Sequence, residues 1–334
     1  MILLMRPKIG ILLGEATGVG PEIVAKVCAQ NNIRIYCKPI LIGDSRVLKA
    51  GMEISDIDFP FSIVKEISKV DWDGPISILD TKNLDPAKIK LGQISEKSGR
   101  ATGELFEKAL QLIKKGDLEG FTFAPYNKLA LDLGGYNIFK LFAHYLKVDW
   151  PFGEINVANN IWISRVTSHI PLKEVSKHLN PKNVTGAIEL AHKTMCLAGI
   201  DQPRIAVAAL NPHGGENGLF GTEEIDIIIP AVNTAKSKGI NALGPFPADT
   251  IFVNALKGFY DGITTMYHDQ GQIALKLMNF ESAVTIIAGV SCPITTPSHG
   301  TAYDIVGKGI ANAKAMEQAI KIAAEMAKRI GNKI

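Results

Sequence analysis

Apolar runs that resemble β-strands alternate with helix-like segments along almost the whole chain. Eight runs are candidate strands: Lys8 to Leu13, Pro39 to Ile42, Ile76 to Leu79, Gly120 to Ala124, Ile161 to Thr167, Arg204 to Ala209, Ile263 to Tyr267 and Ala283 to Ala288. Several are continuously apolar, as strands covered on both faces should be. Helical patterns cover Pro21 to Gln30, Gly99 to Lys115, Pro181 to Ala198, Glu223 to Lys238 and Ala311 to Ile330. The alternation predicts an α/β fold whose mostly parallel sheet is flanked by helices.

Length and composition limit the class of protein further. The chain has 334 residues, enough for two domains, and its 36 basic and 33 acidic residues nearly balance, which argues against a nucleic-acid binder. The four cysteines form no C-x-x-C pair, which fits a reducing compartment. No apolar run approaches the roughly 18 residues of a membrane span. We therefore expect a soluble, cytoplasmic protein whose partners are small molecules or a second copy of itself.

The division into domains is the least visible feature of the sequence. A compositional break lies near Tyr126 to Gly135, where A-P-Y-N-K leaves a strand and D-L-G-G makes a turn. We expect a first α/β domain of residues 1–128 plus 295–334. Residues 129–294 would then form a second α/β domain that carries most of the candidate site residues.

Three histidines each follow one of the predicted strands, the fifth, sixth and seventh of the series above. They are His169, His213 and His268. The carboxyl ends of parallel strands open onto one edge of a sheet, where ligands bind. Three imidazoles delivered to that edge make a metal site with an open coordination position. A single histidine is more often an ordinary surface or core residue, so the repetition is what favours an enzyme.

The loop around His213 carries further candidates. Asn211 to Glu224 reads N-P-H-G-G-E-N-G-L-F-G-T-E-E. Its glycines, Gly214 and Gly215 among them, keep the backbone accessible to a ligand. A purely structural loop would rarely need a histidine, a glutamate and four glycines together, so we interpret this loop as part of a working site.

Other short motifs offer anion-binding and acid–base groups. Tyr267 to Gly271 reads Y-H-D-Q-G and places the Asp269 carboxylate beside a candidate ligand, and Lys276 follows within reach of an anionic substrate. Gly244 to Thr250 reads G-P-F-P-A-D-T, a proline-stiffened turn that presents Asp249. Gly14 to Ile23 reads G-E-A-T-G-V-G-P-E-I and opens a helix after a strand. It lacks the third glycine of a dinucleotide fingerprint, so a strand-to-helix turn is favoured there.

These motifs together resemble the 4-hydroxythreonine-4-phosphate dehydrogenase family of the pyridoxal-phosphate pathway. G-E-A-T-G-V-G-P-E, A-P-Y-N-K, T-S-H-I-P-L, N-P-H-G-G-E, G-T-E-E-I-D, G-P-F-P-A-D-T, Y-H-D-Q-G and H-G-T-A-Y-D occur in family order. The resemblance implies oxidation of a secondary alcohol by a homodimer, dependent on NAD or NADP and on a divalent metal. It implies the two-domain fold of isocitrate and isopropylmalate dehydrogenases, with an active site in the interdomain cleft that is shared across the dimer interface.

The resemblance also assigns roles to individual residues. The metal ligands align with His169, His213 and His268, the last supplied by the partner subunit. Three nitrogen ligands suit zinc, cobalt or nickel better than magnesium or manganese, with zinc the first choice. We expect the remaining roles as follows: Lys276, Asp249 and Asp269 catalytic; His144, Tyr145, Lys276, Thr285 and Ile294 substrate-binding; Gly214, Gly215, Pro245 and Asp249 cofactor-binding.

The chain departs from the family pattern mainly around the substrate. His144-Tyr145-Leu146 stands where the family has His-Thr-Glu, Thr285 replaces an asparagine and Ile294 an arginine. Ser298 replaces the aspartate before H-G-T, and Glu15-Ala16 replaces Asp-Pro. Losing the arginine removes the bidentate donor best suited to a phosphate.

The sequence is therefore compatible with three interpretations of the function. The leading one is a metal-dependent NAD(P) dehydrogenase acting on a hydroxy acid or diol carboxylate other than the vitamin-pathway phosphate, with decarboxylation as an optional second step. The second is 4-hydroxythreonine-4-phosphate dehydrogenase itself with an unusual phosphate site. The third is a catalytically silent metal- or ligand-binding protein on the same fold. The sequence does not name the substrate, the choice between NAD and NADP, or the physiological metal.

Overall fold

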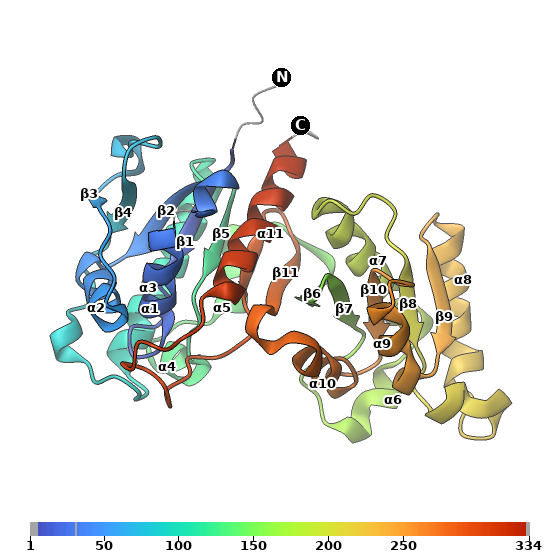
Figure 1. Cartoon of the computed structure of the whole chain (residues 1–334). Helices are drawn as coiled ribbons and strands as arrows, with labels where there is room; N and C mark the ends of the chain where they lie inside the picture. The colour runs from blue at the N-terminus through green and yellow to red at the C-terminus, as the bar shows by residue number, and fades with distance from the viewer. Residues whose placement is uncertain (1–5, 31, 332–334) are drawn as a thin grey trace. The chain divides into compact units, whose positions relative to one another are not determined.

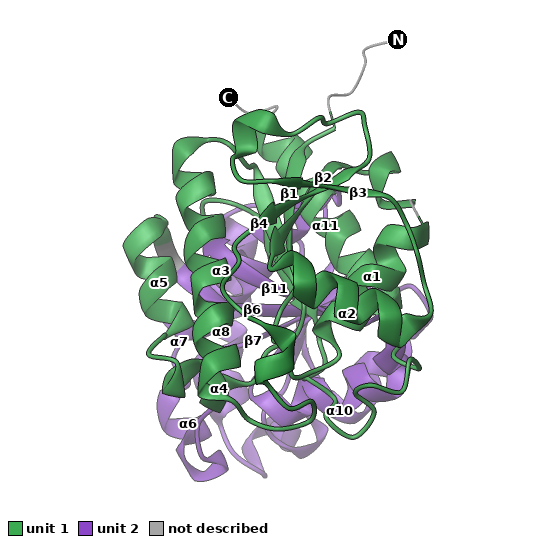
Figure 2. Ribbon diagram, turned by 90° about the vertical axis from the view of Figure 1, so that its left-hand side faces the viewer, with its two compact units in different colours: residues 1–148, 290–334 green, residues 149–289 purple. Residues whose placement is uncertain are grey.

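Two compact units make up the chain. The computed structural model describes residues 6–30 and 32–331. One unit comprises Met1–Val148 with Val290–Ile334, and the other comprises Asp149–Gly289 (Figure 2). The sequence placed the boundaries at 128/129 and 294/295, whereas the units divide at 148/149 and 289/290. The first boundary moves because helices α4 (Lys128–Leu133) and α5 (Ile138–Tyr145) pack against α3 (Glu96–Lys115) of the first unit.

The first unit contains a wholly parallel set of strands. Their order is β3-β4-β2-β1-β5-β12, and each neighbouring pair is parallel. The bounds are β1 Lys8–Leu12, β2 Lys38–Gly43, β3 Phe61–Val64, β4 Ile76–Asp80, β5 Gly120–Phe123 and β12 Ile294–Pro297. The remaining helices are α1 Gly20–Gln30, α2 Ser45–Ser55 and α11 Lys314–Gly331. Figure 2 shows α3 on one face of these strands and α1 and α2 on the other, so both faces are covered.

The second unit has a similar plan that includes an antiparallel pair of strands. The order is β11-β6-β7-β10-β8-β9, in which β6 and β7 are antiparallel and β7, β10, β8 and β9 are parallel (Figure 1). The strands are β6 Val148–Ala158, β7 Ile161–Arg165, β8 Ile205–Ala208, β9 Ala242–Phe246, β10 Gly262–Thr265 and β11 Val284–Val290. The helices are α6 Val175–His178, α7 Pro181–Leu197, α8 Ile229–Ser237, α9 Ala248–Leu256 and α10 His268–Asn279. The predicted α/β class with a mostly parallel sheet is confirmed.

Register places the loops that follow three of these strands at one edge. Thr265 of β10 pairs with Arg165 of β7, and Thr264 pairs with Val207 of β8. The strands therefore end level with one another, and the segments after them leave from the same edge. Within the described residues, no helix is both long enough and apolar enough to cross a lipid bilayer.

An ion pair between Arg204 and Asp261, called the clamp below, joins the amino-terminal ends of two of these strands. The Asp261 carboxylate, just before β10, accepts hydrogen bonds from the backbone N–H of Arg204 at 2.9 Å and from its guanidinium at 2.9 and 2.8 Å. Arg204 immediately precedes β8. The clamp thus helps to fix the register between β8 and β10, whose carboxyl ends lead into candidate site residues.

Candidate functional site

All three predicted metal ligands lie beyond the carboxyl ends of neighbouring parallel strands. His169 follows β7, His213 follows β8, and His268 is the first residue of α10 after β10. The rings of His169 and His268 lie close together, with centroids 5.4 Å apart. The ring of His213 packs against Phe220 instead, with centroids 6.2 Å apart. Among the residues that the structure describes, no three ligating side chains are already gathered into one cluster.

The Nδ1 atom of each of these histidines faces an oxygen. His169 Nδ1 lies 3.4 Å from Ser168 Oγ, and His268 Nδ1 lies 2.7 Å from Asp269 Oδ1. His213 Nδ1 lies 3.7 Å from a carboxylate oxygen of Glu216. Ligating histidines usually donate the ring N–H that is not bound to the metal to such an oxygen, which fixes the tautomer. The donor set therefore suits a divalent cation bound through Nε2.

The loop that carries His213 has an unusual backbone conformation. Its residues from His213 to Gly218 all have φ between 44° and 97°. An ordinary residue pays about 1–2 kcal/mol for the left-handed conformation, and three of these six positions are not glycine. Backbone strain of this kind occurs mostly at ligand-binding and catalytic positions.

A buried glutamate holds this loop in place. The carboxylate of Glu224 is 2% exposed and accepts hydrogen bonds from the backbone N–H groups of Leu210 and Asn211, each at 2.8 Å. It also accepts one from the Asn211 side chain at 3.0 Å. We expected Glu224 only as part of a helix start, whereas its side chain turns back to anchor the loop. The sequence signal for this is a glutamate that begins a helix after a glycine-rich loop.

Helix α10 is tied closely to the strands beneath it. Gln270 donates from Nε2 to the carbonyl of Ala209 at 2.8 Å, and its Oε1 accepts from the backbone N–H of Met266 at 2.7 Å. Gly271 allows the close approach, because a Cβ there would lie 2.8 Å from the Ile163 side chain. Lys276 lies farther along the helix, and its ammonium has no hydrogen-bond or ion-pair partner among the described residues.

The predicted cofactor residues lie on two adjacent loops. The loop after β8 and the end of β9 are joined by a hydrogen bond from the Ala209 N–H to the Phe246 carbonyl at 2.8 Å. Gly214 has φ +70° and open space where a Cβ would be, so its backbone is accessible. Asp249 is exposed in the first turn of α9. Gly214, Gly215, Pro245 and Asp249 thus lie at one corner of the second unit.

The glycines of the first motif have packing roles. A Cβ on Gly18 would lie 2.8 Å from the Thr301 side chain, and one on Gly20 would lie 2.5 Å from the Leu13 carbonyl oxygen. Both positions therefore need glycine for close contact within the first unit. This supports the interpretation of the motif as a strand-to-helix turn.

Glu15 joins three of the motifs of the first unit. Its buried carboxylate accepts hydrogen bonds from the Thr17 hydroxyl at 2.7 Å and the Tyr303 hydroxyl at 2.9 Å. The backbone N–H of Asn127 donates to it at 2.6 Å. Burial, together with the Glu15 charge, raises the pKa of Tyr303. The departure from Asp-Pro in this motif therefore places a longer carboxylate where three loops meet.

The predicted substrate residues differ in their exposure and in the hydrogen bonds that their side chains already make within the chain. His144 is exposed at the end of α5, whereas the Tyr145 hydroxyl donates to Glu107 at 2.9 Å. Thr285 in β11 accepts a hydrogen bond from Asn156 at 2.8 Å. Ile294 in β12 is 0% exposed, so in this structure it contributes packing and no polar contact.

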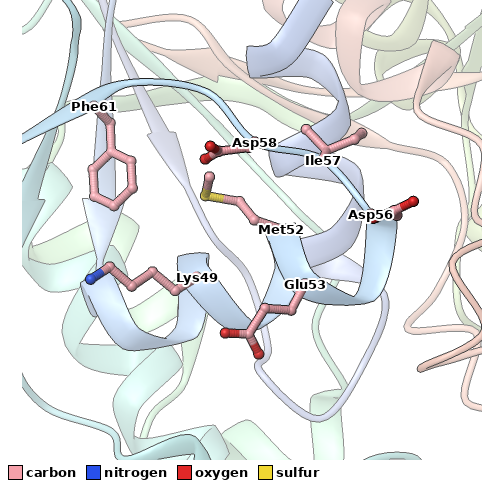
Figure 3. Close-up of a pocket in the computed structure, with 7 residues that line it drawn as sticks. All are labelled: Lys49, Met52, Glu53, Asp56, Ile57, Asp58 and Phe61. Carbon is pink, nitrogen blue, oxygen red and sulfur yellow. The ribbon is translucent and has the colours of Figure 1, made fainter.

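A pocket of about 420 Å³ lies on the first unit at α2, and no predicted site residue lines it. Its lining is Lys49, Met52, Glu53, Asp56, Ile57, Asp58 and Phe61. Figure 3 shows its three carboxylates turned in different directions, so they do not converge on a common point. The pocket therefore lacks the focused polar groups that a small-molecule site needs.

The fold and the histidine-bearing loops define an α/β protein with its candidate chemistry at the carboxyl edge of parallel strands. The chain belongs to the family described as Pyridoxal phosphate biosynthetic protein PdxA, which matches residues 35–323. It is 37% identical to the D-threonate 4-phosphate dehydrogenase of Cupriavidus necator over 330 residues, 97% of this chain and 98% of that protein.

Solved structures give the same family. A 4-hydroxythreonine-4-phosphate dehydrogenase from Burkholderia phymatum is 35% identical, with a TM-score of 0.80 over 96% of this chain and 98% of that one. The enzyme of that name from Klebsiella pneumoniae is 31% identical, with a TM-score of 0.83 over 97% and 99% of the two chains. The expected family is confirmed, and with it an oxidoreductase of the dehydrogenase type.

Proposed function

We propose that this chain is an NAD(P)- and divalent-metal-dependent dehydrogenase that oxidises the secondary alcohol of a small hydroxy acid. The observation that carries the proposal is the placement of His169, His213 and His268. All three leave the same edge of adjacent parallel strands, and each presents Nδ1 to an oxygen. The proposed ligands are the Nε2 atoms of the three rings, with zinc, cobalt or nickel the best-suited ions.

The chemistry divides between the bound groups and the chain. When bound, the cation supplies Lewis acidity at the alcohol oxygen and the nicotinamide accepts a hydride. Asp269 holds the His268 ring through Nδ1, and Lys276 offers an unpaired ammonium to the anionic end of the substrate. The backbone at Gly214 and Gly215, with Pro245 and Asp249, forms the corner where we place the nucleotide.

For the substrate, we propose a hydroxy acid or diol carboxylate other than 4-phosphohydroxythreonine. Ile294 is buried and the Thr285 hydroxyl is engaged by Asn156, so neither replaces the lost guanidinium and amide. Each hydrogen bond to a charged group contributes about 1.5–3 kcal/mol. Two such losses would weaken phosphate binding by about a hundredfold or more, at about 1.4 kcal/mol per decade.

A second candidate is a 4-phosphorylated substrate held by other cations of the chain. It is favoured by the relatives reported above, whose names all specify a 4-phosphate. Lys276 is one side chain that would contribute, because its ammonium has no hydrogen-bond or ion-pair partner among the described residues.

One set of assays separates these candidates. NADH or NADPH formation is followed with Zn²⁺, Co²⁺ or Mg²⁺ on 4-phosphohydroxythreonine, D-threonate 4-phosphate and unphosphorylated D-threonate. We expect metal-dependent turnover and a low kcat/KM for 4-phosphohydroxythreonine. Ordinary efficiency on that compound or on D-threonate 4-phosphate would establish the second candidate, and no reduction of either nucleotide with any substrate and metal would overturn the dehydrogenase.

We also propose that the enzyme is a homodimer with a shared active site. Helix α10 and the residue after it present an apolar stripe to solvent, made of Ile273, Leu277 and Phe280, which are 61%, 83% and 52% exposed. The stripe follows i, i+4, i+7 spacing, the pattern of a helix face that packs against a partner. The same helix begins at His268, so packing of a second copy there would reach the candidate metal ligands.

A further inference from the structure

A partly buried polar network lies next to His169. Its centre is Arg165, the last residue of β7, whose side chain is 5% exposed. The guanidinium donates from Nε to Ser168 Oγ at 3.0 Å, from Nη1 to Asn156 Oδ1 at 2.7 Å, and from Nη2 to Glu154. Burial lowers the pKa of Arg165, partly offset by the Glu154 charge.

The network reaches His169 directly and, on its other side, the helix that begins at His268. On one side, Ser168 Oγ lies 3.4 Å from His169 Nδ1. On the other side, Asn156 Oδ1 also accepts from Gln272 Nε2 at 2.6 Å. Gln272 belongs to α10, the helix that begins at His268.

Ser168 Oγ can accept a hydrogen bond from His169 Nδ1 even while it accepts one from Arg165. Arginine can only donate, so it occupies one lone pair of Ser168 Oγ. The second lone pair is free to accept the Nδ1–H of His169. That arrangement places the ring proton on Nδ1 and leaves Nε2 as the ligating atom.

The charges of the network suit a cation nearby. An unpaired arginine beside a metal site would repel the ion, but Glu154 pairs with Arg165, so the pair carries no net charge. The network therefore positions the histidine without an electrostatic penalty.

We propose that Arg165 and Ser168 are positioning residues for the metal: they fix the tautomer and orientation of His169 and, through Asn156 and Gln272, tie it to helix α10. This inference rests on the proposed metal-dependent function. The relevant quantity is metal affinity, because removing the oxygen partner of a ligating histidine typically costs about 10- to 100-fold in affinity.

The test measures Co²⁺ binding to the full-length metal-free protein by visible absorption, with melting temperature recorded alongside. Ser168→Ala should weaken Co²⁺ binding about 10- to 100-fold, and Ser168→Thr, which keeps the hydroxyl, should stay close to the parent protein. Arg165→Lys keeps the positive charge opposite Glu154 but loses the planar set of guanidinium N–H donors. Its Co²⁺ affinity should therefore lie between those of the two Ser168 variants.

Ser164→Ala is the matched control. Ser164 lies on the same strand, and its hydroxyl bonds Thr264 at 2.9 Å without reaching a histidine. The inference is overturned if Ser168→Ala binds Co²⁺ as the parent protein does, or if Ser164→Ala loses as much affinity. If the parent protein itself binds no Co²⁺, the proposed metal-dependent function fails, and the inference with it.

Discussion

At the scale of single residues, the candidate ligands differ in how firmly the protein already holds them. His268 is held by a 2.7 Å contact to Asp269, whereas the side chain of His213 is 68% exposed on a left-handed loop. On such a loop the backbone carries the conformational strain, and the histidine side chain has only to supply its nitrogen. His213 is therefore the ligand whose removal tests the metal site with the least disturbance to packing.

We predict that His213→Ala abolishes both stoichiometric metal content and turnover while the melting temperature of the metal-free protein stays within about 2–4 °C, the effect of roughly 1 kcal/mol in a protein of this size. Metal content is read by atomic emission and turnover by NADH absorbance. His178→Ala is the control, because His178 is an exposed histidine of α6. Full activity of metal-free His213→Ala would refute the site.

At the scale of secondary-structure elements, the sequence predicted the buried strands of both units well but missed several others. A covered parallel strand is a run of apolar residues, which any periodicity analysis detects. Strand β6 has no such run, because it contains Pro151, Gly153 and Glu154, and its buried Asn156 stands where an apolar residue would be expected. Helix α10 was hidden by Gly271, which is required by the close approach to β7.

The candidate site, too, could be predicted from the sequence only in part. The three histidines could be grouped without the strand order, because each follows an apolar run and the carboxyl ends of parallel strands share one edge of a sheet. Arg165, Ser168 and Gln270 could not be found, because their roles depend on which strands are neighbours in space. Ile294 was interpreted as a lost phosphate contact, and only the structure shows that its side chain is fully buried.

The clamp between the starts of β8 and β10 gives a pH prediction at this scale. Hydrogen bonds from the Arg204 side chain hold the pKa of Asp261 below its usual value. A depressed pKa in the folded state contributes stability above the unfolded value, near 3.9, and this stability is lost as pH falls through the folded pKa. Asp261→Asn should therefore show a shallower loss of unfolding free energy below about pH 4.

Urea unfolding at pH 3, 4, 5 and 7 measures this difference. Because the clamp lies at the edge of the strands opposite the histidines, Asp261→Asn should keep its metal affinity at pH 7. An acid profile identical to that of the parent protein would show that the clamp contributes nothing to folding stability.

At the scale of the whole molecule, the exposed stripe on α10 predicts the mode of assembly. Leu277→Arg places a charge in the centre of the proposed interface, where burying it without a partner is costly. We expect this variant to be monomeric by light scattering at concentrations where the parent protein is a dimer. Ile35→Arg is the control, since Ile35 is 71% exposed on the first unit. A dimeric Leu277→Arg protein would place the interface elsewhere.

Subunit mixing then decides whether each site draws ligands from both copies. His213→Ala and His268→Ala should each be inactive alone. If His268 serves the partner subunit's site, a heterodimer of the two variants contains one site with all three histidines. Random exchange at equal concentrations makes about half of the dimers mixed, so about a quarter of the parent activity should return. In the alternative arrangement, His169 and His268 of the same chain belong to one site, and the 5.4 Å between their ring centroids is compatible with this. In that case every site in the mixture lacks a ligand, and no activity returns after exchange.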